Sequence, residues 1–193
     1  MKKSIIFISA IFLLSFTTKK LVTNTSILIV PESTLIVKGK TNVNKFDCIY
    51  NIQKIKNPIP VFFEMKENKM VFENTELVLE NDCFDCGNKM INKDFQDLLK
   101  SKTHPDIFLK LKELEKLSEN DSVYHANLEL EIAGKTKDYQ IAVVLEQEKD
   151  LIVKGILLLN ICDFNIEPPK KFLGIITVNE IIEINFQLLI TES

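Results

Sequence analysis

Short segments of alternating apolar and polar residues run through residues 107–190 and are separated by brief polar turns. Successive side chains of a β-strand point to opposite faces of a sheet, so a period of two predicts strands with one buried face. In one such segment the apolar positions are Tyr124, Ala126, Leu128, Leu130 and Ile132. The second half of the chain therefore predicts an antiparallel β-meander with an apolar face. Its turns are expected at residues 118–122, 134–137 and 146–150, and its last strand at residues 178–190.

The first half adds further strands and one helix. Expected strands cover residues 25–30, 33–39, 46–55 and 71–80, and the sequence Asn57-Pro58-Ile59-Pro60 ends the third of them. Between Met90 and Lys100 the apolar period changes from two to about 3.6. This change predicts one short helix after the fourth or fifth strand.

A total of eight or nine expected strands favours an all-β fold. An open antiparallel sheet of this size would expose its edge strands, and about eight strands is the size whose interior can hold one small ligand. We therefore expect a closed or nearly closed antiparallel β-barrel of about eight strands, with a two-sheet sandwich as the alternative. The apolar face is then either a filled core or the lining of a cavity, and periodicity does not separate the two.

The N-terminus has the pattern of a secretory signal peptide. Two lysines precede an apolar run from Ser4 to Phe16, and a polar stretch follows. The run is shorter than the roughly 20 residues of a membrane-spanning helix. We expect a signal peptide at residues 1–18, with an uncleaved anchor as the alternative, and a barrel domain at residues 25–190. The protein would then be exported, either to the periplasm or outside the cell.

The charge balance and the cysteines limit the functions that are open to the chain. With 24 basic and 27 acidic residues and no basic block, the sequence argues against a nucleic-acid surface. Export would allow disulfides, and the four candidates permit three pairings: Cys48, Cys83, Cys86 and Cys162. The Cys83-x-x-Cys86 pair could also be redox-active. A zinc site is less favoured, because the two histidines lie in other segments.

Several motifs, in order along the chain, resemble those of YceI-like domain proteins. They are residues 39–46 (GKTNVNKF), 104–107 (HPDI), 128–137 (LELEIAGKTK), 153–166 (VKGILLLNICDFNI) and 185–188 (NFQL). The resemblance implies an extended, eight-stranded antiparallel lipocalin-like β-barrel, whose apolar pore holds a polyisoprenoid or a similar long-chain amphiphile. The chain departs from the family before the helix, where it has the sequence CFDCGN at residues 83–88.

Two features of the 153–166 motif have structural interpretations of their own. Gly155 inside a strand predicts a bend, a bulge or a close approach of a ligand. Asp163 is expected to cap nearby backbone amides and Phe164 to pack inward. The alternative of a catalytic aspartate has no base or nucleophile nearby in sequence to support it.

The apolar faces of the best-patterned strands give the predicted ligand-binding residues. These are Leu128, Leu130, Ile132, Ile141, Val143, Leu157, Leu159, Ile182, Ile184, Phe186 and Leu188. The first hypothesis is a non-enzymatic lipid carrier without metal or cofactor. The alternatives are an exported thiol-disulfide protein using Cys83 and Cys86, and a filled barrel that binds a partner, with a homodimer also possible.

Overall fold

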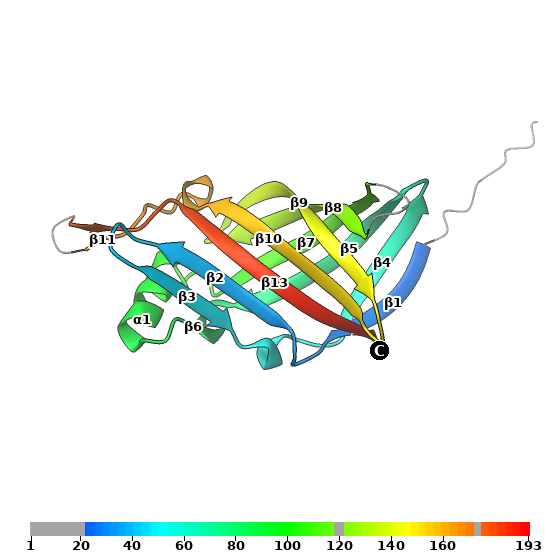
Figure 1. The fold of residues 1–193 in the computed structure, drawn as a ribbon, viewed down its shortest axis with the longest axis horizontal. Coiled ribbons are helices and arrows are strands. Elements are labelled where there is room, and N and C mark those ends of the chain that lie inside the picture. Colours follow the sequence, from blue (N-terminus) through cyan, green and yellow to red (C-terminus); the bar gives the residue numbers. More distant parts are fainter. Residues whose placement is uncertain (1–21, 118–121, 172–174) are drawn as a thin grey trace, which may run out of the picture.

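The computed structural model describes residues 22–117, 122–171 and 175–193. Within these residues eight long strands form a closed antiparallel ring (Figure 1). In ring order they are β1 (Val22–Ile29), β4 (Ile59–Lys66), β5 (Lys69–Glu80), β7 (Asp106–Lys116), β8 (Val123–Ile132), β9 (Lys135–Gln147), β10 (Leu151–Asn160) and β13 (Ile181–Glu192). The pairing of β1 with β13 closes the ring. The predicted all-β fold with eight antiparallel strands is confirmed.

The remaining elements extend this ring. A branch of the sheet continues from β13 through β2 (Thr34–Lys40), β3 (Lys45–Tyr50) and β6 (Phe84–Asp85), and β11 (Lys170–Lys171) pairs separately with β12 (Ile176–Thr177). The described residues also contain three 3₁₀ helices: η1 (Ile52–Lys54), η2 (Asn81–Cys83) and η3 (Ile161–Phe164). No helix in the described part of the chain has the length and apolar character needed to cross a membrane.

The predicted helix is α1 (Lys89–Leu98), which follows β6. It begins after Asn88, whose side chain accepts a hydrogen bond from the amide of Met90, as an N-cap residue does. Figure 1 shows α1 at one end of the ring, whereas the β4–β5 and β9–β10 hairpins lie at the opposite end. We call this opposite end the mouth. The helix therefore covers only one end of the barrel.

Two strand boundaries in the first half differ from the prediction. The expected strand at 46–55 ends at Tyr50, and β4 then begins at Ile59, inside the segment that was expected to end a strand. Pro60 lies within β4, opposite Ser26 of β1. The consecutive apolar residues Val61, Phe62 and Phe63 hide the alternation of this strand, so the pattern alone gave no indication of it.

The turns in the second half are tighter than expected. Ala133 and Gly134 both have positive φ, at 50° and 73°, and they join β8 to β9 as a two-residue hairpin turn. β9 therefore begins at Lys135, within the segment 134–137 that was expected to form the turn. The last strand begins at Ile181 instead of Val178.

A seam opens between β9 and β10, and η3 fills it. Pairing between these strands ends at Gly155 opposite Val143, so β10 diverges from β9 beyond this residue. The ring of Phe164, which is 0% exposed, stacks on Tyr139 with 6.2 Å between centroids. Phe164 packs inward as predicted. The capping role falls to Asn160, which accepts from the Cys162 amide, whereas Asp163 accepts from the Tyr139 hydroxyl at 2.9 Å.

Candidate functional site

All eleven predicted ligand-binding residues lie in the hydrophobic core of the barrel. Seven of them are buried: Leu128, Leu130, Ile132, Ile141, Val143, Leu157 and Leu159. The other four, Ile182, Ile184, Phe186 and Leu188, lie on β13, pack against the core and remain partly exposed. Cross-strand pairs such as Leu157 with Ile184 place both groups on the same inner face.

Several further inward side chains were absent from the predicted set. Leu111 and Leu114 lie on β7, where a β-bulge between Leu111 and Glu113 shifts the register. The bulge brings both leucines opposite inward residues of β8, because Leu111 pairs with Leu128 and Leu114 with Ala126. It also breaks the strict alternation of the sequence, which is why these two positions were missed.

Inward side chains toward the mouth keep part of their surface accessible. We define the mouth-side lining as Leu114, Tyr124, Val153, Leu188 and Ile190, all of which pack against the core yet are only partly buried. Phe63 and Phe72, from the strands of the β4–β5 hairpin, add a ring pair with centroids 5.8 Å apart. A fully packed interior would bury such residues. The inner surface near the mouth is therefore accessible to water.

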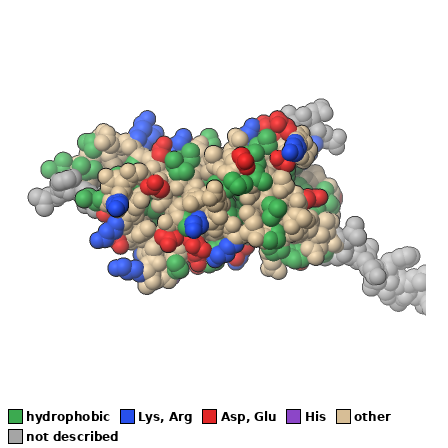
Figure 2. Space-filling view, turned by 90° about the horizontal axis from the view of Figure 1, so that it is seen from below, with side chains coloured by type: hydrophobic (Ala, Val, Ile, Leu, Met, Phe, Trp, Pro, Cys, Tyr) green, Lys and Arg blue, Asp and Glu red, His purple; other side chains and the backbone are tan. Residues whose placement is uncertain are grey.

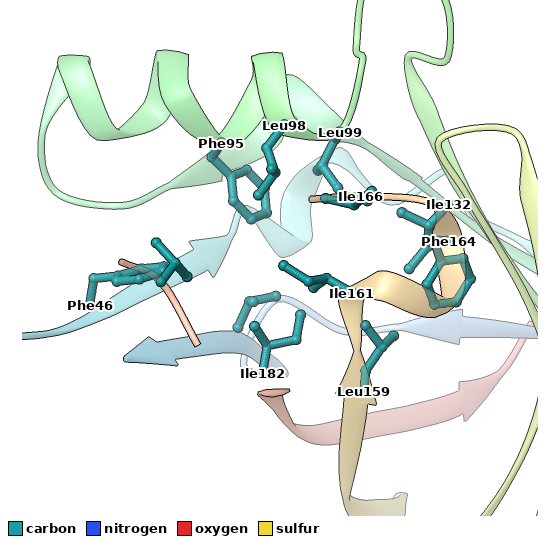
Figure 3. Close-up of a pocket in the computed structure, with 12 residues that line it drawn as sticks. Phe46, Phe95, Leu98, Leu99, Ile132, Leu159, Ile161, Phe164, Ile166 and Ile182 are labelled. Atoms are coloured by element: carbon teal, nitrogen blue, oxygen red, sulfur yellow. The ribbon is translucent and has the colours of Figure 1, made fainter. Parts of the chain in front are cut away.

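The other end of the interior holds a small apolar cavity of about 50 Å³. Figure 3 shows Phe95 and Leu98 of α1, and Leu99 directly after it, reaching toward Ile161 and Ile182 across this cavity. All twelve lining residues are apolar. Pockets for drug-sized ligands measure roughly 300–1,000 Å³, so this cavity alone is too small to enclose a long lipid tail.

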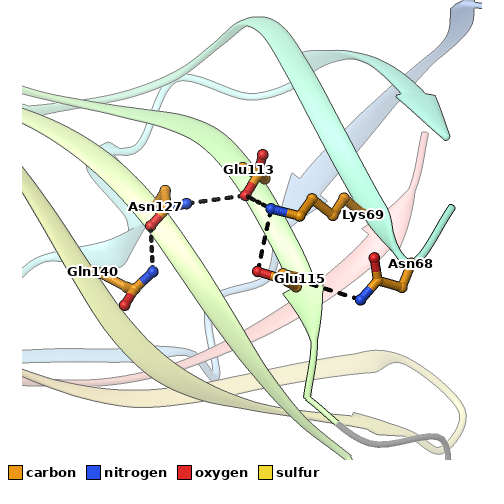
Figure 4. Close-up of polar contacts among 6 residues, drawn as sticks. All are labelled: Asn68, Lys69, Glu113, Glu115, Asn127 and Gln140. Atoms are coloured by element: carbon orange, nitrogen blue, oxygen red, sulfur yellow. Dashed lines mark hydrogen bonds and ion pairs between the residues drawn. The ribbon is translucent and has the colours of Figure 1, made fainter. Parts of the chain in front are cut away.

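Polar groups gather on the outer face of the sheet. Lys69 contacts Glu113 at 3.0 Å and Glu115 at 3.3 Å, and Asn127 links Glu113 to Gln140 (Figure 4). The two carboxylates accept hydrogen bonds from the ammonium and raise the pKa of Lys69. On the face seen in Figure 2, basic, acidic and apolar side chains are interspersed. The charged groups named here are thus separated by the sheet from the apolar interior.

The structure joins two of the four candidate cysteines. Cys48 on β3 forms a disulfide with Cys86, which precedes α1, whereas Cys83 and Cys162 are free thiols. The Cys83–Cys86 bond that the thiol-disulfide hypothesis uses is therefore not the one formed. Burial and the neighbouring Asp82 raise the pKa of the Cys83 thiol, which disfavours the reactive thiolate.

One group of potential metal ligands occurs in the described part of the chain. Glu80, Asp82 and Cys83 offer atoms within 4.8 Å of one another. Glu80 already forms an ion pair with Lys56 at 3.2 Å. The third candidate ligand is the thiol of Cys83. Because the raised pKa of that thiol disfavours the deprotonated form that a metal needs, these residues make a weak ligand set.

Comparisons with known proteins agree with this architecture. BcnA of Burkholderia cenocepacia is 17% identical, with a TM-score of 0.63, over 85% of this chain and 99% of that chain. A polyisoprenoid binding domain from Saccharophagus degradans is 12% identical, with a TM-score of 0.57, over 87% of this chain and 98% of that chain. The YCEI protein of Campylobacter jejuni is 15% identical, with a TM-score of 0.53, over 69% of this chain and 80% of that chain.

At these identities the structural likenesses show the fold alone. No match was found among curated proteins. A sequence model of the YceI-like domain matches residues 63–190, which is more than half of the chain. The chain therefore belongs to the YceI-like domain family.

Proposed function

We propose that this protein binds a polyisoprenoid or a similar long-chain amphiphile in its barrel and carries it without catalysis. The observation that supports this most directly is the mouth-side lining, whose apolar side chains point inward and remain partly exposed. Membership of the YceI-like family and the likeness to a polyisoprenoid binding domain point in the same direction. The filled-barrel hypothesis would instead require these side chains to be buried.

The physical basis of such binding is the transfer of the tail out of water. Each CH₂ group buried against an apolar wall contributes about 0.8 kcal/mol, so a tail needs no charged partner inside the barrel. A polar headgroup would stay in water at the mouth. The mouth-side lining, which includes the predicted residue Leu188, would then form the wall along which the tail lies.

Export is part of the same proposal. The predicted signal peptide at residues 1–18 lies outside the described residues. The Cys48–Cys86 disulfide supports an oxidising compartment, such as the periplasm or the cell exterior, because cytosolic proteins rarely keep structural disulfides. We propose that the exported unit is the domain at residues 25–190.

A titration of delipidated protein with prenols of increasing length tests the binding function. Two variants of β10 provide a matched comparison: Val153→Asp places a carboxylate on the inner face, whereas Ile156→Asp places one on the outer face, where Ile156 is 56% exposed. We expect affinity to rise with tail length, to fall strongly in Val153→Asp and to persist in Ile156→Asp. Affinity that does not depend on tail length, or equal loss in both variants, would overturn the proposal.

A further inference from the structure

Gly155 and Phe186 form an unusual pair on the inner wall. They lie directly opposite each other on β10 and β13. A Cβ atom placed on Gly155 would overlap the ring of Phe186, so the ring occupies the space that a side chain at 155 would take. The aromatic ring therefore lies across the inner face of β10, and the missing side chain allows it to do so.

This pair marks a change in burial along the interior. On the mouth side of Gly155, Val153 is only partly buried, whereas on the α1 side Leu157 is 4% exposed and Leu159 is 1% exposed. On β8 the same change occurs between Tyr124, which is partly buried, and Ala126, which is buried. On β8 and β10 the change from partly buried to buried side chains therefore falls beside the ring of Phe186, whereas Ile184 and Ile182 on β13 stay partly buried.

We propose that Phe186, held against the wall by Gly155, forms the inner limit of the lipid tail and sets the tail length that the barrel accepts. This inference depends on the proposed function and adds a determinant of specificity to it. Beyond Phe186 the tail meets the buried side chains of β8 and β10 and then the 50 Å³ cavity beneath α1. Carbons past this limit gain no buried contact, so they add nothing to affinity.

The two residues should shift the limit in opposite directions. In Gly155→Ala the new methyl group displaces the ring from the wall toward the interior, which shortens the accepted tail. In Phe186→Leu the smaller side chain leaves space toward Leu157 and the α1 end, which lengthens it. Leu retains most of the apolar contact and keeps the variant foldable, whereas Phe186→Ala would leave a larger cavity.

A second glycine and phenylalanine pair supplies a matched control. Gly39 on β2 lies opposite Phe46 on β3, and a Cβ atom on Gly39 would overlap that ring in the same way. Phe46 lines the cavity beneath α1, on the far side of the proposed limit. Gly39→Ala should therefore disturb packing to a similar extent without changing the accepted tail length.

The test measures affinities of the folded, delipidated proteins for prenols of two to nine isoprene units, in steps of one unit. In the wild type we expect affinity to rise with length and then reach a plateau. The plateau should start at least one isoprene unit earlier in Gly155→Ala and one later in Phe186→Leu, and it should not move in Gly39→Ala. Affinity for prenols near the limit should change by at least about tenfold.

The possible results separate the two proposals. A wild type that binds none of the prenols contradicts the proposed function itself. A wild type that binds them, with the same plateau in Gly155→Ala, Phe186→Leu and Gly39→Ala, refutes the role of Phe186 and leaves lipid binding intact. Equal weakening at every tail length would show that the pair acts only on stability.

Discussion

Removal of the Cys48–Cys86 disulfide should destabilise the fold by an amount that follows from the loop it closes. The bonded cysteines are 38 residues apart in sequence. Cross-linking a loop of this size lowers the entropy of the unfolded chain by about 13 cal/mol/K, which corresponds to about 4 kcal/mol at 25 °C. The double variant Cys48→Ala/Cys86→Ala should therefore lose about 2–4 kcal/mol of unfolding free energy, because strain and residual structure reduce the ideal value.

Urea unfolding with and without a thiol reductant measures this loss. The wild type should unfold at lower urea concentration when reduced, and the double variant should show no response to the reductant. Cys83→Ser and Cys162→Ser are matched controls, because both residues are free thiols, and these variants should keep the response. A wild type whose stability is unaffected by full reduction would refute the reasoning, as would a Cys83→Ser variant that loses the response.

Three further changes test other parts of the fold. Phe164→Ala leaves a cavity at the fully buried position between β9 and β10. It should lower the free energy of unfolding, measured in urea, by about 3–5 kcal/mol. A loss below about 1 kcal/mol would contradict the role of η3 in filling the seam between these strands. Burial raises the pKa of Tyr50 to about 12, so the neutral phenol favours folding, and the contribution of Tyr50 to stability should decline as the pH rises from 10 to 12. Tyr50→Phe should make the alkaline decline shallower, with the part that comes from the raised pKa of Tyr139 remaining, and an unchanged pH profile would argue against it. Gly134→Ala places a side chain at a turn position with φ of 73° and against the His104 ring. It should lower the free energy of unfolding by at least about 1 kcal/mol, measured by thermal or urea unfolding. An unchanged midpoint would refute the turn geometry.

The β8 strand illustrates what the sequence could predict. Its alternation is strict, and Ala126, Leu128, Leu130 and Ile132 are all buried. Alternation of apolar and polar residues predicts a strand wherever one face is buried and the other is exposed to solvent. It failed at β4, where apolar residues stand side by side and Pro60 suggested a break. Local pattern therefore identified the regular meander and missed the strand that helps to close the ring.

The candidate site was predictable only in part, for a related reason. The predicted residues came from strands with regular alternation, and all of them face inward. Leu114 was missed because its orientation depends on a β-bulge, and only the pairing of β7 with β8 defines that bulge. The partner of Cys86 likewise depends on the distance between segments that are remote in sequence. Such properties follow from tertiary register, which a single sequence does not contain.

The most direct test of the central claim is mass spectrometry of an organic extract from protein that was purified after natural export. The account predicts a prenyl or other long-chain amphiphile at about one molecule per chain, reduced in Val153→Asp and retained in Ile156→Asp. An extract that is empty, and that stays empty after the protein is incubated with cell lipids, would contradict the account.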